Sequence, residues 1–255
     1  MGGRVGARAG TGFLNQKVTM LGEGGAMRIT LALFLAAAIA VPATAADRNY
    51  SVTSFDRIRV EGPYAISVTT NVAPFARATG SLAAMDGVSL RVEGRTLYVR
   101  ADRSAWGGKP DQPAGPVTIR LGTHDLAMVS LSGAGSIAID RVRGLEFALL
   151  VSGAGSGSIA QTDVDKLRVS VVGAAQAKVA GKAKMFTGNI RGAGMLDASA
   201  LDAKDVALSA LGPVTLRATA TNSAKITATG TSTVTLEGGA ACELKVTGSA
   251  VVTGC

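Results

Sequence analysis

The chain has 255 residues, a formal net charge of +8, and 47% hydrophobic but only 4% aromatic residues. Its basic residues are scattered among acidic ones and form no basic stripe with aromatics, which argues against nucleic-acid binding. Since the chain has one histidine and two cysteines, a Cys/His zinc site has little support, and we expect no metal or other cofactor.

A secretory signal peptide is predicted over residues 27–45. Met27-Arg28-Ile29-Thr30 supplies a basic start, residues 31–41 form an apolar run, and small residues follow it. We expect cleavage after Ala45, with Ala46 as the alternative. A transmembrane anchor is the competing interpretation, but the run is shorter than the roughly 20 residues that a bilayer requires. The mature chain should therefore be exported to the periplasm or cell surface, without a stable membrane span.

Residues 1–26 are not part of the predicted signal peptide, because they are rich in Gly and Arg and lack hydrophobic periodicity. We expect them to be untranslated or unstructured. Translation would then start at Met27 or at Met20.

Residues 46–122 are predicted as a strand-rich part that forms wider first coils and caps one end of the fold. Apolar and polar residues alternate over residues 55–68, and residues 88–100 predict two short strands around Glu93-Gly94-Arg95. Residues 104–115, which hold three Gly and two Pro, are predicted as an exposed loop.

Residues 123–255 carry a Gly-centred phrase that returns about every 20 residues. Leu131-Ser132-Gly133-Ala134-Gly135 reappears as Val151-Ser152-Gly153-Ala154-Gly155 and then in looser forms. A fixed period in this range is typical of a solenoid, in which each repeat is one coil. The glycines that we expect at the coil corners are Gly133, Gly153, Gly173, Gly192, Gly212, Gly230 and Gly248.

Strict alternation of apolar and polar residues around these phrases indicates strands. The prediction is therefore an all-β fold, a parallel β-solenoid with coils of about 20 residues. Since the glycines share the parity of the apolar residues, we expect them to point inward, with polar turns such as residues 163–166 elsewhere in each coil. The alternative is an antiparallel sandwich or propeller with the glycines in hairpin turns. The repeat is too short for a propeller blade of about 40 residues, and it lacks the Asn-Gly or Asp-Gly pairs of tight hairpins.

Cys242 and Cys255 both lie in the last coil. In an oxidising compartment, such a pair predicts a disulfide that keeps the terminal rung from fraying. Two free thiols are the alternative.

An apolar pattern opens the strand-rich part and reads Phe55-x-x-Ile58-x-Val60-x-Gly62-x-Tyr64-x-Ile66-x-Val68. Together with the recurring Ser-Gly-Ala-Gly phrases, it resembles the bacterial head-GIN domain family, labelled "putative auto-transporter adhesin". The resemblance covers about residues 53–253. It implies an exported right-handed β-solenoid with no established catalytic residues.

Candidate catalytic groups are few. His124 stands beside Asp125, but adjacent strand residues point to opposite faces, so we expect a turn histidine. The serines of the repeat phrases lack the Gly-x-Ser-x-Gly elbow and a histidine downstream. Tyr98 and Trp106 could form a sugar-binding spot, although packing of the long loop explains them as well.

A polysaccharide-active solenoid enzyme would need paired carboxylates in a groove. Asp163 and Asp165 could stack near Asp202 and Asp205 on successive turns, although Asp is also favoured in turns for local hydrogen bonding. We predict instead a non-catalytic exported module of a Gram-negative envelope, acting in binding, adhesion or as a scaffold. Its partner would be an envelope component, a carbohydrate or a protein, and end-to-end self-association is a further hypothesis.

Overall fold

The computed structural model describes residues 46–102 and 116–255. The predicted signal peptide, its cleavage after Ala45 and the loop that contains Trp106 lie outside these residues. Within the described ranges, no helix combines the length and apolar character needed to cross a membrane.

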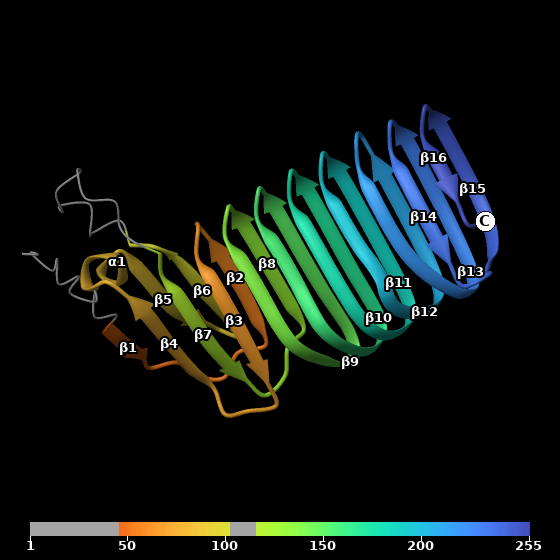
Figure 1. Ribbon diagram of the computed structural model, residues 1–255. Helices are drawn as coiled ribbons and strands as arrows, with labels where there is room; N and C mark the ends of the chain where they lie inside the picture. Colours follow the sequence, from red (N-terminus) through yellow and green to blue (C-terminus); the bar gives the residue numbers. More distant parts are fainter. Residues whose placement is uncertain (1–45, 103–115) are drawn as a thin grey trace, which may run out of the picture. The chain divides into compact units, whose positions relative to one another are not determined.

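Five long strands form the regular part of the molecule (Figure 1). Each pairs in parallel with the next along most of its length, which confirms the predicted parallel β-solenoid. Each strand descends one wall of the solenoid, bends, and returns along the opposite wall. The strands are β9 (Ser136–Gly153), β10 (Ser156–Gly173), β11 (Gln176–Gly192), β12 (Met195–Leu211) and β13 (Thr215–Gly230).

The core consists of inward side chains stacked in columns. Phe147 lies in register with Leu167 on the next rung, followed by Phe186 and Val206. All four side chains are buried. Because parallel rungs repeat about every 4.8 Å, each column forms a continuous apolar stack through the solenoid.

The expectation that the corner glycines point inward is wrong. Gly133 is exposed, whereas Gly135, two residues further on, is buried. The corner glycines instead adopt positive φ values, from +86° at Gly248 to +116° at Gly133. A Cβ on Gly173 would lie 2.7 Å from the carbonyl oxygen of Gly153. The close neighbour is thus the preceding rung, and the opposite wall plays no part.

The polar turn expected at residues 163–166 is also absent, because β10 runs through it without interruption. Val164 is buried there between the exposed Asp163 and the half-buried Asp165. The chain therefore bends between the walls while its backbone keeps strand pairing with both neighbouring rungs.

The N-terminal coils do not stack in chain order. β2 (Arg57–Glu61) lies between β6 (Thr96–Ala101) and β8 (Met128–Gly133), parallel to both. Likewise, β3 (Ala65–Thr70) lies between β7 (Thr118–Thr123) and β9. The coil of β2 and β3 comes first in the sequence. In the stack, however, it lies between the coil of β6 and β7 and the coil of β8 and β9.

Antiparallel strands, and not the wider coils that we expected, close the N-terminal end. β4 (Phe75–Gly80) pairs antiparallel with β7 and with β1 (Ala46–Tyr50). The predicted pair around Gly94 is confirmed as an antiparallel hairpin of β5 (Val88–Glu93) and β6. A short helix, α1 (Leu82–Asp86), was not predicted from the sequence.

The C-terminal end consists of three short strands. β14 (Thr233–Glu237) and β15 (Ala241–Gly248) both pair with β13, and β16 (Val251–Thr253) pairs with β14. The predicted disulfide between Cys242 and Cys255 is present, with 5.7 Å between the two Cα atoms. It links β15 to the last residue of the chain.

Candidate binding surface

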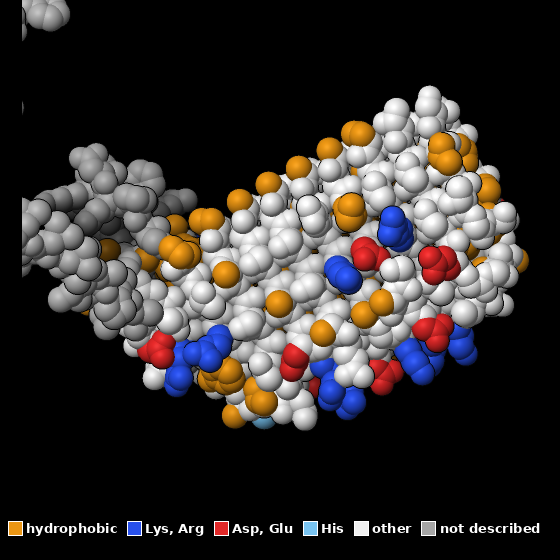
Figure 2. All heavy atoms as spheres, in the orientation of Figure 1, with side chains coloured by type: hydrophobic (Ala, Val, Ile, Leu, Met, Phe, Trp, Pro, Cys, Tyr) orange, Lys and Arg blue, Asp and Glu red, His pale blue; other side chains and the backbone are white. Residues whose placement is uncertain are grey.

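The four aspartates of the enzyme hypothesis do not come together. Asp163 lies in register with Lys182, and Lys182 lies in register with Asp202. Figure 2 shows the result as blue and red side chains alternating along the lower edge. The expected acidic patch is therefore wrong, because a rung of lysines separates carboxylates that lie two rungs, roughly 10 Å, apart.

The remaining contacts of these aspartates are ordinary surface pairs. Lys184 Nζ lies 2.8 Å from Asp165 Oδ1. Asp205 Oδ1 accepts hydrogen bonds from Ser223 Oγ and Asn222 Nδ2, at 2.6 and 2.7 Å, and these bonds lower the pKa of Asp205. The structure thus removes the specific basis for a polysaccharide-active site at this edge. Nor does any group of three or more His, Cys, Asp and Glu in the described ranges have an arrangement that could hold a metal ion.

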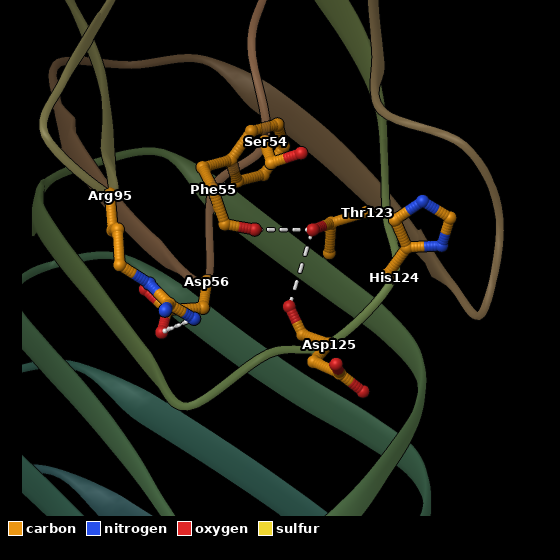
Figure 3. A pocket seen from close by; sticks show the side chains of 7 residues that line it. All are labelled: Ser54, Phe55, Asp56, Arg95, Thr123, His124 and Asp125. Atoms are coloured by element: carbon orange, nitrogen blue, oxygen red, sulfur yellow. Dashed lines mark hydrogen bonds and ion pairs between the residues drawn. The ribbon is translucent and has the colours of Figure 1, made fainter.

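A cavity of about 270 Å³ lies beside the N-terminal coils (Figure 3). Arg95 Nη2 reaches Asp56 Oδ2 at 2.7 Å, while Asp56 Oδ1 is buried without a hydrogen-bond partner among the described residues. The Thr123 hydroxyl contacts the carbonyl oxygens of Phe55 and Asp125. These contacts join the residues just before β2 and β6 to the end of β7, so structural contacts account for the positions of these side chains. Its lining residues are Ser54, Phe55, Asp56, Arg95, Thr123, His124 and Asp125.

His124 lies in the bend that follows β7 and is exposed, as predicted for a turn histidine. In Figure 3 its ring and the Asp125 carboxylate point in different directions. The two side chains therefore do not form a catalytic pair.

Tyr98 is half-buried on β6, and the Arg100 guanidinium lies 5.8 Å from the centre of its ring. Trp106 lies outside the described residues. The proposed sugar-binding spot of Tyr98 and Trp106 remains a prediction.

A shallow groove of about 250 Å³ crosses four rungs on the outer wall, over β9, β10, β11 and β12. Two columns of outward side chains in register line it. The first column is Ser136, Ser156, Gln176 and Met195, and the second is Ala138, Ser158, Lys178 and Asp197. Gly157 lies between the columns, and because a Cβ there would point into the core, 2.9 Å from Val151 Cγ2, the groove floor at this position is backbone.

The charged side chains of the groove lie on β11 and β12. Asp197 Oδ1 accepts hydrogen bonds from the Ser199 hydroxyl at 2.6 Å and from the Ser199 amide at 3.2 Å. These bonds, with Lys178 and Arg217 nearby, lower the pKa of Asp197, which therefore stays ionised at neutral pH. Lys178 Nζ lies 3.9 Å from Asp197 Oδ2. The groove thus offers hydroxyl, amide and ammonium donors beside a carboxylate acceptor.

Sequence reasoning missed this groove. The signal was the run of small residues after each Gly phrase, such as Ser156-Gly157-Ser158, but depth arises only when several rungs are aligned. Only the inter-strand register places Gln176 and Met195 beside these serines.

Solved structures share this fold. A "putative adhesin" from Bacteroides fragilis is 20% identical, with a TM-score of 0.73 over 82% of this chain and 96% of that one. A "putative lipid binding protein" from Parabacteroides distasonis is 17% identical, with a TM-score of 0.66 over 83% and 96%. A "putative adhesin" from Parabacteroides merdae is 19% identical, with the same TM-score and coverage. At these identities the likeness establishes the fold alone.

No curated protein matches the chain. A family model does match, over residues 54–240, which span most of the described solenoid. Its description agrees with the resemblance carried by the opening apolar pattern and the Ser-Gly-Ala-Gly phrases. The chain belongs to the family described as "Putative auto-transporter adhesin, head GIN domain".

Proposed function

We propose that this protein is an exported, non-catalytic binding module of the bacterial envelope and that it holds a glycan chain along the groove over β9–β12. The groove itself carries the proposal, because it is lined by two in-register columns of hydrogen-bonding side chains. The adhesin description of the family and the predicted signal peptide support an exported location.

A glycan suits this lining better than a compact ligand. Ser136 and Ser156 offer hydroxyls one rung, about 4.8 Å, apart, and Gln176 adds an amide on the next rung, so an extended polymer can meet a hydrogen-bonding group on successive rungs. Ser158 adds a hydroxyl in the second column. Lys178 and Asp197 add a donor and an acceptor for sugar hydroxyls. Because the groove is shallow and open, only part of a ligand would be buried, and we expect modest affinity per site.

Binding should depend on the open space of the groove. Ser158→Trp fills the groove between Ala138 and Lys178, and we expect it to weaken glycan binding about tenfold or more, equivalent to about 1.4 kcal/mol. Thr235→Trp is the matched control, because Thr235 belongs to the same outward column but lies on β14, outside the groove. The measurement is titration calorimetry with envelope glycans selected on an array.

Three results would contradict the proposal. If the wild-type protein binds no glycan, the proposed function is wrong. If the two tryptophan variants bind with equal affinity, the glycan binds somewhere other than this groove. Shortening of the bound glycan during incubation would show turnover and contradict a non-catalytic role.

A further inference from the structure

The C-terminal end of the solenoid has unpaired strand edges. β15 pairs with β13 on one side, β16 pairs with β14 on one side, and no described strand lies on their other sides. Both strands stand at the end of the stack in Figure 1. An unpaired strand edge presents a row of backbone N–H and C=O groups that can pair with another chain.

The core is also open at this end. Leu244 and Val246 lie in register with Ile226 and Ala228, which are only 1% and 0% exposed. The last layer, by contrast, leaves Leu244 46% and Val246 44% exposed. The edge is therefore apolar on its inner side as well as unpaired in its backbone.

The outward side chains of β15 show what would pair with it. Glu243 and Lys245 flank Leu244 and have opposite charges. In an antiparallel pair of two β15 strands centred on Leu244, Glu243 of each copy lies opposite Lys245 of the other. A parallel, in-register pair would instead oppose like charges, which is unfavourable.

We propose that the C-terminal edge binds a second copy of this chain through antiparallel pairing of β15 with β15, about a two-fold axis at Leu244. This pairing places Leu244 opposite Leu244, and Val246 opposite Cys242 of the second copy, which covers the open apolar layer. The interface uses the same surface on both copies and closes at two, as in most two-fold dimers.

The electrostatics on each copy agree with this arrangement. Lys225 Nζ already lies 2.7 Å from Glu243 Oε1. Lys245 has no ion pair within the described ranges, and the second copy would supply one. The disulfide joins Cys242 of β15 to Cys255. It therefore closes a covalent loop that contains both edge strands, β15 and β16, which the second copy would meet.

The direct test is the oligomeric state of the purified full chain by sedimentation velocity over a range of concentrations. Wild type should pass from monomer to dimer as concentration rises. Leu244→Lys should weaken dimerisation about tenfold or more, because it places two ammonium groups at the axis. Leu145→Lys, the same change at a side chain 78% exposed on the bend of β9, should leave the dimer intact.

A charge exchange tests the antiparallel register separately. Glu243→Lys or Lys245→Glu alone opposes like charges twice and should weaken the dimer, while the double variant E243K/K245E should restore it. Circular dichroism confirms that each variant folds. A wild-type chain that stays monomeric at the highest soluble concentration, or a double variant no better than the singles, would overturn the proposal.

Discussion

The two ends of this solenoid solve the same physical problem in different ways. At the N-terminal end the chain reverses strand direction, so that antiparallel β1, β4 and β5, with α1, cover the first parallel coils. At the C-terminal end the parallel stack stops, and its last layer remains half exposed and fixed by one disulfide.

The difference follows from how a solenoid is made. Each coil covers the core of the coil before it, so an end without a following coil exposes a layer of apolar side chains and a backbone edge. The N-terminal cap carries charges near its edge, where Arg48 Nη2 lies 2.7 Å from Asp86 Oδ1. The C-terminal end has no such cover in the described residues, which is why we assign it to a second copy.

The largest loss of stability should come from adding a side chain at a corner glycine, where successive coils are in close contact. Gly173→Ala would place a Cβ 2.7 Å from the Gly153 carbonyl oxygen at a φ of +92°, and should cost about 2–4 kcal/mol of unfolding free energy. Gly94→Ala in the N-terminal hairpin also has a positive φ but meets nothing within 4 Å, and should cost about 1 kcal/mol. Urea unfolding measures both. Equal costs would show that close stacking of the coils does not restrict the corners.

The disulfide should stabilise one end selectively. The double variant C242S/C255S should lose about 2–3 kcal/mol, because the bond closes a loop over a sequence separation of 13. By amide hydrogen exchange, β15 and β16 should lose protection while β1 and β4 keep theirs. Reductant should reproduce the effect in the wild type and do nothing to the variant. A uniform loss of protection over both ends would contradict the idea of a local staple.

The smallest effect concerns the helix of the N-terminal cap. The Ser81 hydroxyl accepts a hydrogen bond from the Ala84 amide at 3.2 Å and caps α1. Ser81→Ala should therefore cost about 1 kcal/mol, while Ser81→Asp should restore most of it. Thermal unfolding monitored by circular dichroism checks both variants. If Ser81→Ala is neutral, α1 contributes no measurable stability to the cap.

The local pattern of the sequence was enough to predict the strands within residues 55–68 and 88–100 and in the repeats, the coil length and the disulfide. Alternation of apolar and polar residues depends only on the geometry of one strand, and a repeat of about 20 residues reports one coil at a time. Cys242 and Cys255 are close in sequence and share the terminal coil, so their pairing required no knowledge of distant contacts. The direction of the corner glycines was misjudged because parity alone does not reveal a positive φ.

The order of the coils and the candidate site depend on pairing between rungs. The register of that pairing brings together residues that are far apart in the sequence and share no local pattern. It inserted β2 and β3 between later strands, placed Lys182 between Asp163 and Asp202, and aligned small side chains into a groove. The antiparallel cap depends in the same way on which edge each strand can reach. The sequence thus specifies the coil as a unit, whereas the candidate site and the contrast between the two ends arise only when coils are stacked.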